Sequence, residues 1–282
     1  MTSQVAKAQA FRDLHLREKL FVLPNAWDVP TARMFEDLGF PAVATSSTAL
    51  NASLGYPDGE SIPRTEFLQA IHRIARSLTV PLSADILAGF GRSPAEVADT
   101  VRSVIEAGAV GVNLEDLDPV TDKLFPISEQ VAKVRAIRDL AESVGFSVVL
   151  NARTDALYFA PGTPSERMEE AIRRASAYRD AGADAVYPRG LAKAEEIATF
   201  VPRLKCPVNV QIRKGLPPLE ELQRLGIRRV SFGPYASYAS LGLLRRAAEE
   251  LNGQGTYLTL IEGAIDYETI NRLAVPKAHS GP

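Results

Sequence analysis

The sequence has a single cysteine, Cys206, among 282 residues. An internal disulfide and a zinc site built from several cysteines are therefore excluded, which favours a reducing compartment such as the cytoplasm. No apolar stretch continues uninterrupted for ~18 residues, and the first residues mix charges into their apolar positions, so neither a membrane span nor an export signal is predicted. We expect a cytoplasmic protein.

The chain also lacks an excess of either charge. It carries 32 basic and 34 acidic side chains, a formal net charge of −2, and only 7% aromatic residues. Nucleic acids and anionic membranes are bound mainly by clustered Lys and Arg, so neither is an expected partner, whereas small ligands are. Phosphate-binding loops of the Gly-x-x-x-x-Gly-Lys type and Gly-x-Ser-x-Gly nucleophile turns are absent as well.

Short β-branched runs alternate with longer amphipathic segments along the whole chain. Alternation of this kind predicts parallel strands joined by right-handed helical crossovers. Eight such strand–helix units predict an α/β fold of the (β/α)₈ TIM-barrel type. An open doubly wound sheet is the alternative, but no Gly-x-Gly-x-x-Gly turn follows the first run. The expected strands are 21–23, 42–45, 82–85, 111–115, 147–151, 184–187, 208–211 and 229–232.

Local signals place helices between these strands. Ser93-Pro94-Ala95-Glu96 and Thr163-Pro164-Ser165-Glu166 each supply an N-cap, a proline and the glutamate of a capping box. Residues 1–255 are expected to form the barrel. An apolar tail, residues 256–282, is expected to pack on its own barrel or on a neighbouring subunit.

Polar residues finish several of the predicted strands. In a barrel of this type the active site lies at the carboxyl ends of the strands. Asp85, Glu115 and Asp116 would there offer hard oxygen ligands suited to Mg²⁺ or Mn²⁺, or they would cap helices and pair with arginines. Arg153 can hold a carboxylate through two parallel hydrogen bonds, or it can pair with Glu115. His15, His72 and His279 do not finish a strand, so a histidine base or metal site is not expected.

These motifs, in this order and spacing, resemble the isocitrate lyase and phosphoenolpyruvate mutase superfamily. The resemblance covers nearly the whole chain and rests on Pro-Asn-Ala-Trp-Asp (24–28), Thr-Ser-Ser (45–47), Gly-Tyr-Pro-Asp (55–58), Ser-Ala-Asp (83–85), Gly-Phe-Gly (89–91), Gly-Val-Asn-Leu-Glu-Asp (111–116), Ala-Arg-Thr-Asp (152–155), Gly-Ala-Asp-Ala-Val (182–186) and Arg-Val-Ser-Phe-Gly-Pro (229–234). It implies a barrel whose last helix is exchanged between paired subunits, in a homotetramer formed as a dimer of dimers. It also implies Mg²⁺ at the strand ends and a 2-oxo or 2-hydroxy acid as substrate.

The resemblance also implies roles for individual residues. Asp85 would bind the metal and Glu115 would support it through water. Ser46 and Ser47, with Asn209 nearby, would bind the substrate carboxylate, and Arg153 would hold the other end of the substrate. Asp58 would lie over the reacting centre from the loop 46–63.

Three departures from the family pattern limit the choice of reaction, one of them that Tyr187-Pro188-Arg189 stands near the end of the sixth strand, where the isocitrate lyase branch has a glutamate. Leu87 stands two residues after Asp85, where relatives usually have a second acid; on an extended segment its side chain would share the face of Asp85. The loop 116–126 lacks the catalytic cysteine of the isocitrate lyase branch.

The sequence therefore favours a Mg²⁺-dependent lyase or hydrolase that cleaves a C–C bond in a small, oxaloacetate-like 2-oxo or substituted dicarboxylic acid through an enolate-type intermediate. The alternatives are a phosphonopyruvate mutase or hydrolase acting on a C–P bond, and a catalytically degenerate barrel that binds a metabolite.

Overall fold

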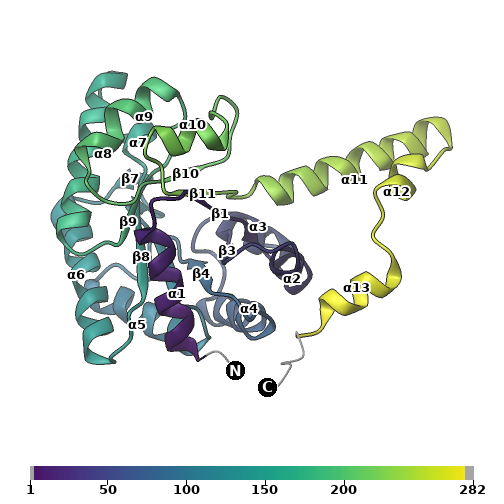
Figure 1. Ribbon diagram of the computed structural model, residues 1–282, viewed down its shortest axis with the longest axis horizontal. Helices are drawn as coiled ribbons and strands as arrows, with labels where there is room; N and C mark the ends of the chain where they lie inside the picture. The colour runs from purple at the N-terminus through teal and green to yellow at the C-terminus, as the bar shows by residue number, and fades with distance from the viewer. Residues whose placement is uncertain (1–2, 277–282) are drawn as a thin grey trace.

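The computed structural model describes residues 3–276, and its centre is a barrel of parallel strands (Figure 1). The strands pair in the order β2-β3-β4-β5-β8-β9 in one stretch and β10-β11-β1 in the other. Their bounds are β1 Phe21–Leu23, β2 Asn25–Ala26, β3 Val43–Thr45, β4 Leu82–Asp85, β5 Gly111–Glu115, β8 Val149–Thr154, β9 Ala185–Pro188, β10 Asn209–Gln211 and β11 Arg229–Ser231.

The two stretches join at both edges. Pro24 separates β1 from β2 because it has no N–H to donate. The chain nevertheless continues in the same direction, and the Ala44 amide donates to the Pro24 carbonyl. At the other edge Val186 of β9 bridges to Val208 in parallel, directly before β10. The barrel is closed in this way, and the eight predicted runs supply its wall, so the (β/α)₈ prediction is confirmed.

Helices surround the barrel and connect its strands. They are α2 Val29–Asp37, α4 Arg64–Ser77, α5 Pro94–Glu106, α6 Ile127–Ser143, α8 Pro164–Asp180, α9 Ala194–Phe200 with the 3₁₀ turn η1 Val201–Arg203, and α10 Leu219–Arg224. Ser93 and Thr163 cap α5 and α8 through the predicted capping boxes. The buried stripes of these helices, including Phe67, Ile71 and Ile74 of α4, pack on the outer side of the strands.

Helix α1, Gln4–Leu16, closes the amino-terminal end of the barrel. Its Phe11 is fully buried against the first residue of β5, Gly111, where an added Cβ would lie 2.6 Å from the Phe11 ring. His15 of the same helix packs edge-on against the rings of Phe11 and Phe21. A ligand can therefore reach the barrel interior only from the carboxyl ends of the strands.

Several short elements lie in the loops at that open end. They are α3 Ser47–Ser53, the hairpin of β6 Leu117–Asp118 and β7 Lys123–Leu124, and α7 Ala156–Phe159. Helix α3 forms inside the predicted active-site loop 46–63. Its N-cap is Ser46, whose hydroxyl accepts from the Ala49 amide at 3.3 Å.

The last helices form an arm that projects from the barrel (Figure 1). Helix α11, Tyr235–Gln254, extends outward, α12, Leu258–Glu262, turns back, and α13, Tyr267–Ala274, packs against α2 and pairs Arg272 with Asp37. The division at residue 255 remains a prediction, and the tail beyond 276 lies outside the described residues.

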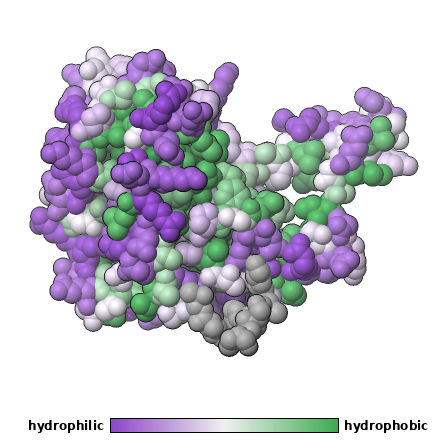
Figure 2. Space-filling model, viewed as in Figure 1, coloured by the Kyte–Doolittle hydropathy of each residue, from purple (hydrophilic) through white to green (hydrophobic). Residues whose placement is uncertain are grey.

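The arm leaves many apolar side chains exposed, as the green surface in Figure 2 shows. They include Leu241, Leu244, Leu251, Leu258 and Ile261, all at least 48% exposed. Within residues 3–276, no helix is long and apolar enough to cross a membrane. Apolar exposure on this scale is typical of a protein–protein contact surface.

Candidate active site

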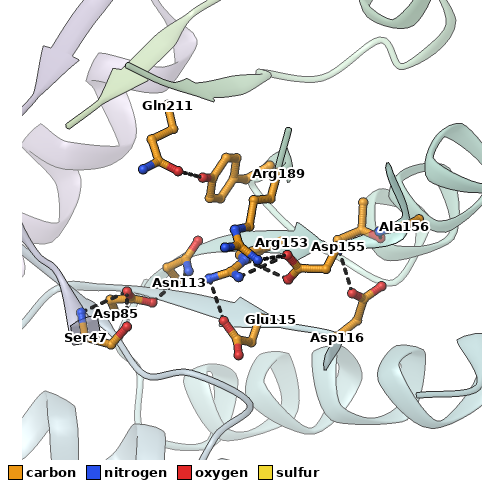
Figure 3. Close-up of polar contacts among 12 residues, drawn as sticks. Ser47, Asp85, Asn113, Glu115, Asp116, Arg153, Asp155, Ala156, Arg189 and Gln211 are labelled. Atoms are coloured by element: carbon orange, nitrogen blue, oxygen red, sulfur yellow. Dashed lines mark hydrogen bonds and ion pairs between the residues drawn. The ribbon is translucent and has the colours of Figure 1, made fainter. Parts of the chain in front are cut away.

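A small polar cavity opens at the carboxyl ends of the strands. Its volume is about 120 Å³, and residues from nearly every strand of the barrel line it. Figure 3 shows the polar network on one side of this cavity, with Asp85 at one end and Arg153, Asp155 and Arg189 at the other. The size suits a small acid rather than a drug-sized ligand, which needs ~300 Å³ or more.

Asp85 ends β4 and directs its carboxylate among neutral hydrogen-bond donors. Oδ2 accepts from the Ser47 amide at 3.1 Å and from the Ser47 hydroxyl at 2.8 Å, and Oδ1 accepts from Asn113 Nδ2 at 2.9 Å. Asn113 is fixed in turn by Asn151, whose Nδ2 donates to Asn113 Oδ1 at 2.8 Å. Within residues 3–276 no cation forms an ion pair with Asp85, so its hydrogen-bond partners are all neutral.

Arg153 lies on β8, two strands along the barrel from Asp85, and two buried acids hold it. Its Nη1 lies 2.5 Å from Glu115 Oε2, and its Nε and Nη2 lie 2.8 and 3.0 Å from the Asp155 carboxylate. Asp155 also receives Arg189 Nη1 at 2.9 Å. A guanidinium has five N–H donors; Nη2 forms a hydrogen bond to Asp155, whereas Nε, although close to Asp155, forms none. The acids fix the orientation of Arg153 while its remaining donors face the cavity.

The carboxyl group of Glu115 is buried beside Arg153. Burial, together with the nearby Asp155, Asp85 and Asp58, raises the pKa of Glu115 to about 8, although Arg153 opposes this rise. The alternative stated for Arg153, pairing with Glu115, is present in the structure as the contact between Nη1 and Oε2. Glu115 itself lies behind Arg153 and does not line the cavity.

The remaining predicted substrate ligands all line the cavity. Ser46 directs its amide to the Ala26 carbonyl at 3.1 Å, and Ser47 gives both of its donors to Asp85. Asn209 donates to the Ser231 hydroxyl at 3.2 Å. Asp58 is exposed at the rim and accepts from the Thr48 hydroxyl at 2.9 Å. Their roles toward a substrate remain predictions.

Asp116 does not belong to the cavity, contrary to the expectation that it joins Asp85 and Glu115. It is 0% exposed and accepts from the Tyr178 hydroxyl at 2.7 Å, the Asp155 amide at 2.9 Å and Arg174 at 3.1 Å. Successive residues of a strand point to opposite sides, so Asp116 faces α8 because Glu115 faces inward. Its contacts lock the Asp155 backbone in place.

Leu87 also departs from the expectation. Strand β4 ends at Asp85, and Leu87 has a φ of 55°, in the left-handed region, so the segment is not extended there. The side chain is 3% exposed and does not line the cavity. The prediction that position 87 shares the face of Asp85 is therefore wrong, because the chain turns immediately after the strand.

Some cavity residues escaped the sequence analysis. Asn25 accepts from the Phe232 and Gly233 amides at 2.9 and 2.8 Å and donates to the Thr45 carbonyl at 2.7 Å, joining strands at both ends of the chain. Tyr187 donates to Gln211 Oε1 at 2.5 Å. Arg229 begins its strand rather than ending it, so a search of strand ends passes over it. The signal for Asn25 was its position just after the first strand.

The donor set at Asp85 suits a hard, hydrated cation. No group of three or more His, Cys, Asp or Glu side chains able to hold a metal occurs among the described residues. Mg²⁺ binds through one or two carboxylates and keeps several waters, so Asp85 alone can hold it, whereas zinc would require more protein ligands. Cys206 offers none, since it lies away from the cavity and burial raises its pKa to about 11.

The closed parallel barrel, with its polar site at the carboxyl ends of the strands, has the architecture of a TIM-barrel enzyme, and comparison with known proteins identifies the family. The sequence matches the family described as phosphoenolpyruvate phosphomutase over residues 11–252. The chain belongs to this family and, with it, to the isocitrate lyase and phosphoenolpyruvate mutase superfamily. Its members are lyases and mutases, and the protein is an enzyme of this type.

Individual relatives cover most of the chain. An uncharacterized protein of Mycobacterium tuberculosis is 34% identical over 265 residues, covering 92% of this chain and 97% of its own. The 2-methylisocitrate lyase of Bacillus subtilis is 30% identical, covering 89% and 82%. The oxaloacetate decarboxylase of Pseudomonas putida is 32% identical, covering 82% and 80%.

Solved structures agree with the fold. A Burkholderia cenocepacia protein assigned as a lyase or mutase superposes with a TM-score of 0.89 at 38% identity, covering 95% of this chain and 96% of its own. Oxaloacetate acetylhydrolase with bound oxalate superposes with a TM-score of 0.83 at 27% identity, covering 95% and 93%.

Proposed function

We propose that the protein is a Mg²⁺-dependent lyase or hydrolase that cleaves a C–C bond in a small 2-oxo or substituted dicarboxylic acid of the oxaloacetate type. The observation that carries this proposal is that Asp85 and Arg153, two strands apart in the barrel, line the same cavity of about 120 Å³. One group suits a cation, the other suits a carboxylate, and the space between them suits a compound of a few carbon atoms. The names of the oxaloacetate relatives support the same substrate class.

Asp85, with water, would hold Mg²⁺, and Mn²⁺ would fit the same oxygen donors. When bound, the cation would supply positive charge that stabilises an enolate oxygen. A cation at Asp85 would compete with Ser47 for the same carboxylate and leave the Ser47 donors free for the substrate carboxylate. Glu115 and Asp155 would act as positioning residues, because they reach the substrate only through Arg153.

In this scheme the C3–C4 bond of an oxaloacetate-like acid, one carbon beyond the 2-oxo carbon, would break: C4 would leave as CO₂ and the electron pair of the bond would pass through C3 to the 2-oxo oxygen as an enolate. A proton then completes the product. Asp58, exposed on the loop that carries α3, lies where it could cover the reacting carbon. Arg153 would orient the second carboxylate of the substrate through guanidinium N–H donors that its acidic partners do not use.

Isocitrate-type cleavage has less support. The hairpin after β5 occupies the place of the loop that bears the catalytic cysteine in that branch, and it contains none; Asp118 of this hairpin instead pairs with Arg92 at 3.1 Å. Phosphonopyruvate chemistry remains the second candidate, because Asp58 does line the cavity.

A panel of purified substrates tests the proposal. Oxaloacetate, a substituted malate, 2-methylisocitrate and phosphonopyruvate would each be assayed with and without Mg²⁺. We expect turnover of an oxaloacetate-like acid that depends on the metal. Turnover of phosphonopyruvate alone would support the C–P alternative, and metal-dependent binding of an acid without turnover would support a degenerate barrel.

We also propose that the protein is a homo-oligomer, a dimer of dimers in which the arm carrying α11 is exchanged. The exposed leucines of α11 and α12 support this, since a partner barrel would cover them. Removing the residues after Gly253 should then give a smaller or aggregating species in light scattering. A truncated protein of native size and solubility would count against the exchange.

A further inference from the structure

A buried arginine forms the floor of the cavity. Arg229 opens β11, is 3% exposed and lines the same cavity as Asp85. Ser231 lines the cavity two residues further along the strand, so Arg229 lies one layer, ~6.6 Å, deeper in the barrel. Ser83, two residues before Asp85 on β4, lies at the corresponding depth and also lines the cavity.

The polar partner of Arg229 is a neutral histidine. His15 Nδ1 lies 2.8 Å from the Phe11 carbonyl, which can only accept, so Nδ1 carries the proton. Nε2 is then left as an acceptor and lies 3.4 Å from Arg229 Nη1. Burial, reinforced by the charge of Arg229, lowers the pKa of His15 to about 3, so it is neutral at physiological pH. His15 therefore orients the guanidinium without contributing charge to it.

Other buried arginines in this protein have acidic partners. Arg33 is 2% exposed and pairs with Glu36; Arg174 is 7% exposed and pairs with Asp116 at 3.1 Å. Arg229 forms no ion pair within residues 3–276. Asp85 is the acid whose charge reaches it, and a cation bound at Asp85 would remove that compensation. A buried charge is rarely left without a partner of opposite charge. An anion bound on the floor of the cavity would supply that partner for Arg229.

Further polar atoms around Arg229 are also without partners. Arg229 Nε, Ser83 Oγ and Asn209 Oδ1 are buried and form no hydrogen bond within the protein. The interior of a barrel at this depth is ordinarily filled by branched apolar side chains. Nε–H and a hydroxyl can both donate to an anion, and Asn209 Oδ1 can accept from a water that hydrates it.

We propose that Arg229 and Ser83 form an anion subsite on the floor of the cavity, and that it binds a small carboxylate or an anion of similar size. A guanidinium with free donors recognises a carboxylate, and the cavity excludes larger anions. The anion is either the far carboxylate of a dicarboxylic substrate or a separate ion beneath it. The subsite stands on this geometry alone and does not require the proposed reaction.

Sodium acetate is the probe that tests the subsite, at constant ionic strength balanced with sodium gluconate, whose anion is too bulky for the cavity. The thermal midpoint of the wild-type protein should rise saturably with acetate, by roughly 3 °C or more. The carboxyl resonance of ¹³C-labelled acetate should broaden in parallel. Arg229→Met should lose the part of both effects that comes from the floor and keep only acetate binding at Arg153, whereas Arg189→Met, which removes a cation from the rim of the same cavity, should keep both parts.

An acetate response that is unchanged in Arg229→Met, or lost in Arg189→Met instead, would overturn the proposal, as would a wild-type protein that does not respond. If Arg229→Met does not fold, Arg229→Lys serves in its place, because it keeps the charge with fewer donors. It should bind acetate about tenfold more weakly than wild type, and equal binding would contradict the subsite.

Adding oxalate distinguishes the two sources of the anion. If the floor receives the far carboxylate of a substrate, succinate should bind more tightly than acetate and should displace both acetate and oxalate. If the floor holds a separate ion, acetate and oxalate should stabilise the protein additively. Both patterns retain the anion subsite, and neither depends on turnover.

Discussion

The two sides of the cavity hold their charged groups in different ways. Asp85 is held by neutral donors from Ser47 and Asn113, whereas Arg153 is fixed by the buried carboxyl groups of Glu115 and Asp155. Neutral hydrogen bonds exchange at low cost when a ligand replaces them, but a buried ion pair is strongly destabilised when either partner is removed. The Asp85 side is thus suited to exchange ligands, and the Arg153 side is suited to remain rigid.

The largest effect on turnover is expected at Asp85, whose neutral hydrogen bonds can be replaced by a ligand. Asp85→Ala should abolish Mg²⁺-dependent turnover and leave the fold intact, because a strand-end carboxylate bound by neutral donors contributes little to core packing. Steady-state kinetics and circular dichroism check both parts. Asp99→Ala, which removes an exposed acid paired with Arg64 on the outside of the barrel, is the matched control. Unchanged turnover in Asp85→Ala would show that the reaction does not need a metal ion at Asp85.

The rigid side should respond to a change of shape at constant charge. Arg153→Lys loses the planar fork that contacts two acids and a ligand, so kcat/KM should fall at least tenfold, or ~1.4 kcal/mol of transition-state stabilisation. Arg64→Lys, on the barrel exterior, should leave kcat/KM unchanged. If Arg153→Lys is as efficient as wild type, Arg153 is only the structural partner of Glu115.

The rigid side should also respond to pH. The folded-state pKa of Glu115 is about 8, above the ordinary value of 4.5, so the folded protein binds this proton more tightly than the unfolded chain does. The associated stability is complete below pH ~4.5 and is lost as the pH rises toward ~8, at up to ~1.4 kcal/mol per pH unit. Glu115→Gln cannot titrate and should lack this slope.

Chemical denaturation of wild type and Glu115→Gln at pH 5.5 and 8 measures that difference. The free energy of unfolding of Glu115→Gln, relative to that of wild type, should increase from pH 5.5 to pH 8. A constant difference would mean that Glu115 remains ionised throughout and that the Arg153 side is a simple ion pair.

The smallest effect on metal binding is expected at Leu87. Since its side chain is buried away from the cavity, Leu87→Glu should not tighten Mg²⁺ binding, although it should destabilise the fold by about 1–3 kcal/mol because it buries a carboxyl group. Leu87→Met, of similar volume, should be close to wild type. A tenfold gain in Mg²⁺ affinity in Leu87→Glu would show that position 87 does reach the metal.

The sequence predicted the parts of the molecule that follow a local rule. Strand and helix order followed from periodicity and from caps such as Ser93 and Thr163, and the site from the polar residues that end strands. The prediction for Leu87 was wrong because tertiary contacts determine where a strand ends. The prediction for Asp116 was wrong because they also determine to which side a residue at the strand end points. The sequence analysis gave Arg229 no role, because what distinguishes this residue is that no acid pairs with it in the fold. A sequence pattern does not show which side chains pair.

The calorimetric titration of oxalate into the protein, with and without Mg²⁺, tests the central claim most directly. Oxalate is a small dicarboxylate that requires no turnover to be measured. The account predicts that wild type binds oxalate at least tenfold more tightly when Mg²⁺ is present, and that Asp85→Asn loses this dependence while retaining its fold. Equal affinity with and without the metal, or the same metal dependence in Asp85→Asn, would contradict it.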